Sequence, residues 1–122
     1  MVRPKSNRAR ERRIEQEIVV DAYTSDERAM SWFYYLEEKL GFPFKAKCIA
    51  ARGISPLKKG EEVEVLGMAP EDDCMKEMFV RVRFAGRKLG VPLAQIEPIK
   101  PDKATREAME DWGYWMAMGY EF

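Results

Sequence analysis

Apolar residues recur at helical spacing in three parts of the chain. Ile14, Ile18 and Ala22 lie four positions apart and predict a first helix. A second apolar stripe lies within residues 24–40, and a third lies within residues 102–117. The pattern therefore predicts two helices near the N-terminus and one helix near the C-terminus.

The second predicted helix carries start and stop signals. Thr24 is suited to cap its N-terminus, and Glu27 three positions later completes a capping box. Gly41 and Pro43 follow the last apolar position of the stripe and should end the helix. We therefore expect this helix to have well-defined ends.

Between the second and third helices, the apolar pattern changes to the alternation typical of β-strands. Four segments show it, namely residues 44–50, 61–66, 78–84 and 88–91. Ala85, Gly86 and Arg87 separate the last two segments and should form a hairpin turn. Short strands between terminal helices predict an α+β fold. We expect a small SH3-like, β-barrel-type antiparallel sheet flanked by two N-terminal helices and a C-terminal helix.

The length and composition fit one domain. At 122 residues the chain lies within the usual domain size of about 100–200 residues, so we expect a single domain spanning residues 1–122. Hydrophobic residues make up 46% of the chain, which is enough for one small core. No apolar run approaches the roughly 20 residues of a membrane helix, and no apolar segment follows the basic N-terminus as in a secretory signal. We expect a cytoplasmic protein with no membrane partner.

The available side chains exclude several kinds of reactive site. The chain has no histidine, which removes Ser-His and Cys-His nucleophile systems, and it has no G-x-x-x-x-G-K-[ST] phosphate loop. Cys48 and Cys74 alone cannot supply a four-ligand zinc site made of nitrogen and sulfur. We expect Cys48 to be a small buried strand residue and Cys74 to be a partly exposed thiol. The sequence predicts a protein that is not an enzyme.

A balanced total charge conceals an uneven distribution. Residues 1–13 hold six basic residues and one acidic residue, a net charge of +5, and the rest of the chain carries −5. This basic arm could contact nucleic acid or an acidic protein. We favour a second interpretation, in which the arm is a solvated tail that becomes the first turns of a helix.

Acidic residues form three separate clusters. They are Glu37 with Glu38, Glu71 with Asp72 and Asp73, and Glu110 with Asp111. Calcium takes six to eight oxygen ligands at about 2.3–2.6 Å, and carboxylates are among its usual ligands. Because the chain has no EF-hand loop motif, calcium ligands would have to come from segments that the fold brings together. The alternative is that these acidic runs are simply solvated.

Aromatic residues are concentrated in residues 32–44 and 112–122. Stacking on nucleobases would place basic residues between exposed rings. Here the neighbours are acidic, since Glu37–Glu38 and Glu110–Asp111 adjoin the two groups. We therefore expect these rings to pack in a core between the helices, and we do not expect them to bind nucleic acid.

One succession of residues resembles a known family. Residues 32–73 join an aromatic helix with paired glutamates to a strand, a Lys-Gly turn, a second strand and the acidic loop Glu71–Asp73. Together with residues 17–23, Val91-Pro92-Leu93 with Gln95, and Glu110-Asp111-Trp112, this succession resembles the CcbP-type calcium-binding family. Members of that family are small bacterial proteins that hold calcium without an EF-hand.

The resemblance implies an intracellular calcium buffer or sensor that binds Ca2+. It implies that the ligands lie among the three acidic clusters, and it leaves any protein partner unspecified. The alternative function is an SH3-like interaction module that contacts nucleic acid or an acidic protein through residues 1–13.

Overall fold

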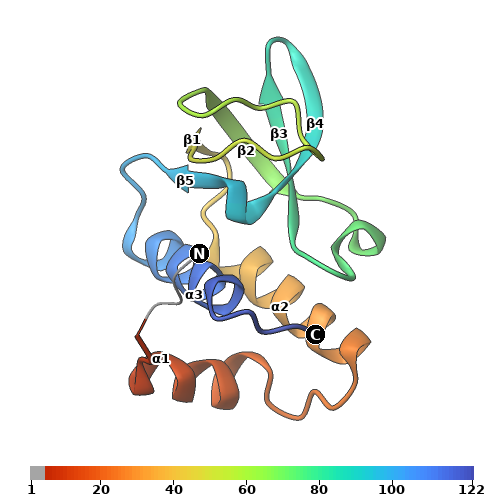
Figure 1. Cartoon of the computed structure of the whole chain (residues 1–122), viewed down its shortest axis with the longest axis vertical. Coiled ribbons are helices and arrows are strands. Elements are labelled where there is room, and N and C mark those ends of the chain that lie inside the picture. The colour runs from red at the N-terminus through yellow and green to blue at the C-terminus, as the bar shows by residue number, and fades with distance from the viewer. Residues whose placement is uncertain (1–4) are drawn as a thin grey trace.

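The computed structural model describes residues 5–122, and within this range the chain forms three α-helices and five strands (Figure 1). The helices are α1 (Arg8–Arg13), α2 (Ser25–Lys39) and α3 (Lys103–Ala117). The strands are β1 (Phe44–Cys48), β2 (Glu62–Met68), β3 (Phe79–Phe84), β4 (Arg87–Pro92) and β5 (Ile96–Pro98). Three short helical turns, η1 (Ile14–Ile18), η2 (Glu71–Cys74) and η3 (Leu93–Gln95), lie between them. This arrangement confirms the predicted α+β class.

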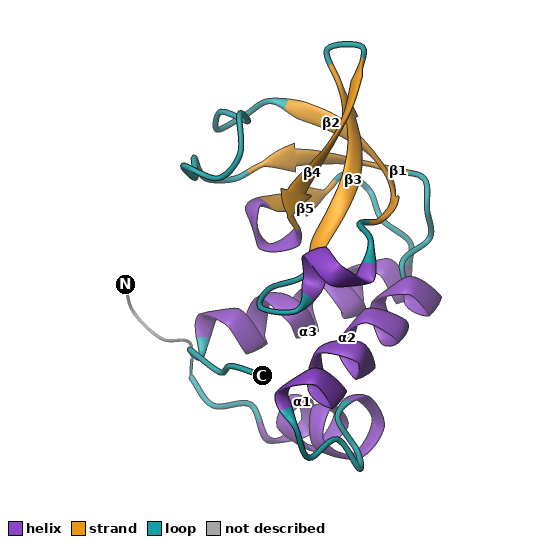
Figure 2. Ribbon diagram, turned by 90° about the vertical axis from the view of Figure 1, so that its right-hand side faces the viewer, coloured by secondary structure: helices purple, strands orange, loops and turns teal. Residues whose placement is uncertain are grey.

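The strands form one antiparallel sheet in the order β4-β3-β2-β1-β5. The sheet occupies one half of the molecule and the helices occupy the other half (Figures 1 and 2). The expected barrel is not formed, because β4 and β5 are the two edges of the sheet and do not pair with each other. The chain leaves β4 through η3, and the short β5 then pairs with β1 alone.

The predicted hairpin between β3 and β4 is confirmed. Its two central residues, Ala85 and Gly86, have φ angles of 51° and 76°. Two positive φ angles in succession are typical of the tight turns whose twist matches that of the flanking strands. The hairpin therefore brings the basic side chains of Arg83 and Lys88 opposite each other in the register of the sheet.

The helices are held together by an aromatic core. Trp32 of α2 is fully buried, and its ring centroid lies 5.0 Å from that of Trp112 and 5.5 Å from that of Trp115 on α3. The rings of Trp32 and Trp112 meet edge to face, which is a favourable aromatic geometry. The prediction that the aromatic residues pack between helices is confirmed for these residues. Tyr34 is an exception because it is 53% exposed.

The first helical segment is shorter than the apolar repeat predicts. Ile14 and Ile18 are buried as expected, but the helix ends in a π-turn in which the Val19 amide donates to the Ile14 carbonyl. Asp21 then adopts a positive φ of 59°, which turns the chain out of the helix before Ala22. A repeat of four residues does not reveal this turn. The turn depends on the backbone conformation, whereas the repeat reports only which side chains are apolar.

The two cysteines are both free and buried. Cys48 lies on β1 as predicted. The prediction that Cys74 is partly exposed is wrong, because η2 turns its side chain inward, where the Phe79 amide contacts its sulfur at 3.4 Å. Burial is the largest cause of the raised pKa of the Cys74 thiol. In the part of the chain that the structure describes, no helix is both long and apolar enough to span a membrane.

Candidate calcium site

The fold brings one helix-end glutamate, Glu37, and the acidic loop to the same face of the molecule. The hydroxyl of Tyr34 on α2 donates to Oε1 of Glu71 on η2 at 2.9 Å. Glu37, one helical turn after Tyr34, also lies close enough to act on this hydroxyl. The hydrogen bond to Glu71, the charge of Glu71, a little burial and the charge of Glu37 together raise the pKa of Tyr34. One phenol therefore bonds to a carboxylate of the acidic loop and is also near enough to a helix-end carboxylate to be affected by its charge.

The acidic loop itself is a short 3-10 turn. Its side chains Glu71, Asp72 and Asp73 are all exposed, and the Asp73 amide donates to the Pro70 carbonyl at 2.9 Å. Within residues 5–122 none of these carboxylates forms an ion pair with a basic side chain. Three adjacent negative charges repel one another, and a bound cation would relieve that repulsion.

The side chains present are of the kind that calcium prefers. Glu37, Glu71, Asp72 and Asp73 offer carboxylate oxygens at an exposed surface, which suits a hard divalent cation. Among the described residues, however, no three acidic or thiol side chains are already gathered closely enough to hold a metal. Backbone carbonyls and water must therefore complete any coordination of six to eight oxygens.

Glu38 does not share the surroundings of Glu37. Both side chains are exposed near the end of α2, but successive helical residues point about 100° apart. The expectation that the two glutamates do not bind one ion together from within the helix stays a prediction.

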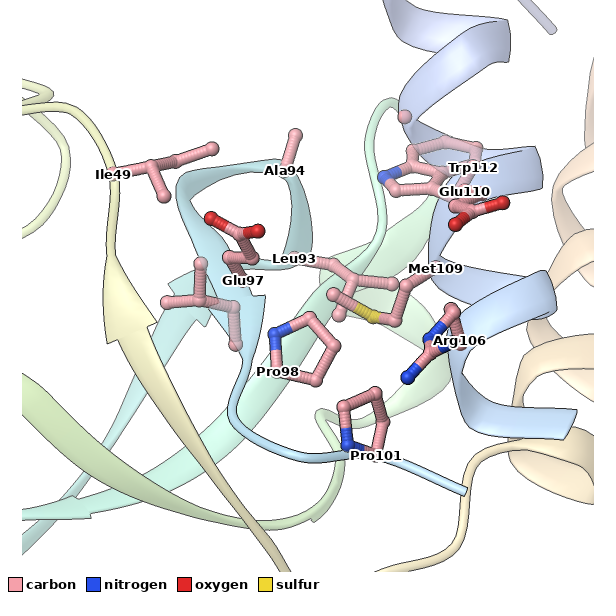
Figure 3. Close-up of a pocket in the computed structure, with 12 residues that line it drawn as sticks. Ile49, Leu93, Ala94, Glu97, Pro98, Pro101, Arg106, Met109, Glu110 and Trp112 are labelled. Carbon is pink, nitrogen blue, oxygen red and sulfur yellow. The ribbon is translucent and has the colours of Figure 1, made fainter. Parts of the chain in front are cut away.

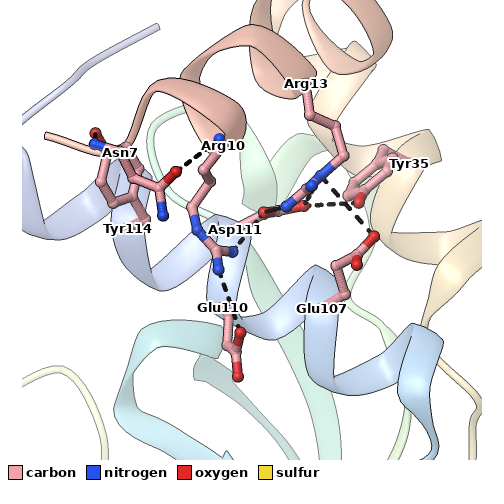
Figure 4. A network of polar contacts seen from close by, with 8 residues as sticks. All are labelled: Asn7, Arg10, Arg13, Tyr35, Glu107, Glu110, Asp111 and Tyr114. Carbon is pink, nitrogen blue, oxygen red and sulfur yellow. Dashed lines mark hydrogen bonds and ion pairs between the residues drawn. The ribbon is translucent and has the colours of Figure 1, made fainter.

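The third predicted cluster is split by burial (Figure 4). Asp111 is fully buried and accepts hydrogen bonds from Arg10 at 2.6 Å, from Arg13 at 2.5 and 3.1 Å, and from the Tyr35 hydroxyl at 2.8 Å. Glu110 is exposed and lies 3.3 Å from Arg10. Two guanidinium groups already neutralise the Asp111 carboxylate, so in this arrangement Glu110 and Asp111 do not offer a calcium site.

The surroundings of Asp111 also change the pKa of its partners. The hydrogen bond to Asp111 is the largest cause of the raised pKa of Arg13. Burial, followed by the hydrogen bond to Asp111, raises the pKa of Tyr35. Both shifts favour the protonated side chain, so Arg13 and Tyr35 keep donating to Asp111 across the neutral pH range.

The N-terminal arm is correspondingly less solvated than we expected. Asn7 caps α1 by accepting from the Arg10 amide at 3.0 Å, and the Asn7 amide donates to the Tyr114 hydroxyl at 3.1 Å (Figure 4). Tyr114 in turn donates to Glu11 at 2.7 Å. Arg8 and Arg12 remain exposed, and Arg3 lies outside the described residues.

Sequence reasoning missed three members of these sites. Tyr34 could have been found, because it precedes Glu37 by three positions and therefore lies on the same helical face. The spacing of Arg10 and Arg13 likewise places them on one face, but nothing in the sequence identifies Asp111 as their partner about 100 residues later.

Comparison with known proteins identifies the class of protein that carries these features. The sequence model of a family described as calcium binding, Calci_bind_CcbP, matches residues 12–116. The chain therefore belongs to the CcbP family of calcium-binding proteins. No curated protein matches the chain.

Two solved structures support the same assignment. The chain is similar to the crystal structure of CcbP from Anabaena, with 45% sequence identity, a TM-score of 0.89 and coverage of 100% of both chains. It is also similar to a calcium binding protein in its calcium-binding form, with 45% identity and a TM-score of 0.85 over 95% of each chain. The sequence-based resemblance to this family is thus confirmed.

Proposed function

We propose that this protein is a calcium buffer or sensor whose ion binds where the end of α2 meets η2. The observation that carries this proposal is the hydrogen bond from Tyr34 of α2 to Glu71 of η2, which joins the helix end to the acidic loop. Membership of the CcbP family, which is described as calcium binding, indicates that the ion is Ca2+. We place its ligands among Glu37, Glu71, Asp72 and Asp73, with Glu38 at the margin. Glu110 and Asp111 are excluded from this proposal because Arg10 and Arg13 contact them.

The proposed role is binding and not catalysis. When bound, the ion would supply positive charge to a surface on which several carboxylates lie together. Tyr34 holds Glu71 beside α2, and η2 keeps Asp72 and Asp73 at the surface. A cytoplasmic location and a single domain over residues 1–122 stay predictions.

The alternative of an SH3-like module with a nucleic-acid-binding arm has little support. The sheet is not closed into a barrel, and two of the arm's basic residues, Arg10 and Arg13, contact the buried Asp111. Both guanidinium groups are therefore already paired with a carboxylate.

Calcium should stabilise the folded protein. A ligand that binds only the folded state adds RT ln(1 + [L]/Kd), which is about 2.7 kcal/mol at a hundredfold excess over Kd. For a chain of this size, that corresponds to a rise in Tm of about 10 °C. We expect this rise when calcium is added to protein stripped with EDTA, and a smaller rise with the same concentration of magnesium. An unchanged Tm, together with a flat calorimetric titration, would exclude specific calcium binding.

Removing the charge of the acidic loop should weaken calcium binding. The double variant D72N/D73N keeps an oxygen in each side chain but loses two negative charges, so we expect the calorimetric Kd for calcium to rise at least tenfold. The matched control is E15Q/E17Q, which removes the same charge from two exposed positions of η1. If both variants bind calcium as the unmodified protein does, the ligands lie elsewhere and the family function remains. If both weaken it equally, the effect is one of net charge.

A further inference from the structure

A second candidate site lies apart from the proposed calcium site. It is a cavity of about 400 Å³ between α3 and the η3–β5 segment (Figure 3). Figure 1 shows β5 and η2 on opposite sides of the molecule. Leu93, Ile96 and Met109 contribute apolar side chains to the cavity, and its volume is within the range of small-molecule sites, about 300–1,000 Å³.

The wall of this cavity contains an indole N–H with no partner. Trp112 is 1% exposed, and its Nε1 makes no hydrogen bond with any group in residues 5–122. Figure 3 shows this nitrogen on the side of the ring that is turned toward Ala94 of η3, and both residues line the cavity. Buried donors are nearly always paired, so a donor beside a cavity indicates a place for a ligand acceptor.

The cavity also contains a cation that is not neutralised. Arg106 lines it and forms no ion pair among the described residues. Of the two acids that line the same cavity, one forms an ion pair and the other has a basic residue opposite it in the sheet. Glu110 lies 3.3 Å from Arg10, and Glu97 is opposite Lys47 in the register of β1 and β5. Arg106 is exposed and has no carboxylate partner among the described residues, so it is available to pair with an anion that enters the cavity.

The helix face that lines the cavity leaves space open. Arg106, Met109, Glu110 and Gly113 follow the i, i+3, i+4, i+7 spacing of one helical face. A β-carbon added at Gly113 would meet no heavy atom within 4 Å. Glycine in a helix interior is less favourable than alanine by about 1 kcal/mol. A glycine at this lining position therefore leaves the cavity wider than a larger residue would.

We propose that this cavity binds a small carboxylic acid with an apolar aromatic or branched body. Arg106 would pair with the carboxylate, and the apolar body would contact Leu93 and Met109. The Trp112 N–H would donate to an oxygen of the ligand. This inference concerns a site separate from the calcium site and does not depend on it.

Three probes of one shape test the proposal. Phenylacetate, phenylacetamide and phenethylammonium carry the same ring and differ in charge. We expect phenylacetate to bind with a Kd of about 1 mM, as suits a ligand of its size, and to shift the indole N–H signal of Trp112 and the amide signals of residues 106–113 in NMR spectra of labelled protein. Phenylacetamide should bind at least tenfold more weakly, and phenethylammonium should not saturate. Adding calcium or EDTA should leave the order of affinities of the three probes unchanged.

Matched variants separate the cavity from general charge effects. R106Q should weaken phenylacetate binding at least tenfold, whereas K103Q, which removes a charge from an exposed position on the same helix, should not. G113L should block the cavity, and G113A should keep its fold and its binding. The proposal is overturned if phenylacetate leaves these signals unchanged at 20-fold above that Kd. It is also overturned if the amide or the amine binds as well as the acid, or if R106Q and K103Q behave alike.

Discussion

Replacing Asp111 with asparagine should lower the free energy of unfolding by about 3 kcal/mol. The side chain keeps its size, so no cavity forms, but Arg10 and Arg13 lose the carboxylate between them. Breaking a buried ion pair by removing one partner costs about 3–5 kcal/mol because the remaining charge is left uncompensated. We expect the lower end of that range, since Arg10 and Arg13 are 19% and 26% exposed and water can partly replace the lost partner.

Urea unfolding followed by tryptophan fluorescence measures this effect. The matched control is E110Q, which removes the neighbouring charge from a side chain that is 55% exposed and should change stability by less than about 0.5 kcal/mol. Y35F removes one hydrogen bond to Asp111 and should cost about 1 kcal/mol. If D111N costs no more than E110Q, the network at Asp111 does not hold α1 against α3.

Truncating Trp32 to alanine should cost about 3–5 kcal/mol, which is the usual range for removing a large buried aromatic side chain. Trp32 is fully buried and its ring contacts those of Tyr35, Trp112 and Trp115, so the space it leaves cannot be filled without moving α2 against α3. The expected result is a large fall in the urea midpoint. A protein with W32A that unfolds near the original midpoint would show that the helices repack at little cost.

The variant W32F provides an informative comparison. The Nε1 of Trp32 has no hydrogen-bond partner within residues 5–122. Leaving a buried donor unpaired costs about 1–3 kcal/mol, and phenylalanine removes that donor while it keeps most of the ring. We therefore expect the lost packing to be largely offset, so that W32F destabilises the protein by about 1 kcal/mol or less. A loss close to that of W32A would mean that the whole indole is needed.

Much of the fold could be predicted because its signals are local. Thr24 caps α2 as expected, with its hydroxyl oxygen accepting from the Glu27 amide at 3.1 Å. The strands β1 to β4 lie within two residues of the four segments whose apolar positions alternate. The closure of the sheet could not be predicted in this way, because it depends on which distant strands pair and not on the alternation within each strand.

The candidate site likewise has features that the sequence predicts locally and others that depend on contacts between distant segments. The sequence and the family resemblance grouped Glu37, Glu71, Asp72 and Asp73 with three further acids as candidate ligands, and in the fold Glu71 bonds to Tyr34. The same reasoning could not separate Asp111 from them, since an acidic residue looks alike in sequence whether it faces water or a buried arginine. Only the docking of α1 on α3 makes that distinction.

The docking of α1 on α3 also determines when, during synthesis of the chain, the helices can assemble. The partners Arg10 and Asp111 are separated by 101 positions. Translation at about 5–20 residues per second leaves roughly 5–20 s between the synthesis of one and that of the other. During that interval Asp111 is absent, so Arg10 and Arg13 of the first helical segment cannot form their ion pairs with it. The docking of α1 on α3 therefore has to follow the synthesis of α3. Final assembly of the helical half is therefore a step that cannot precede the synthesis of α3.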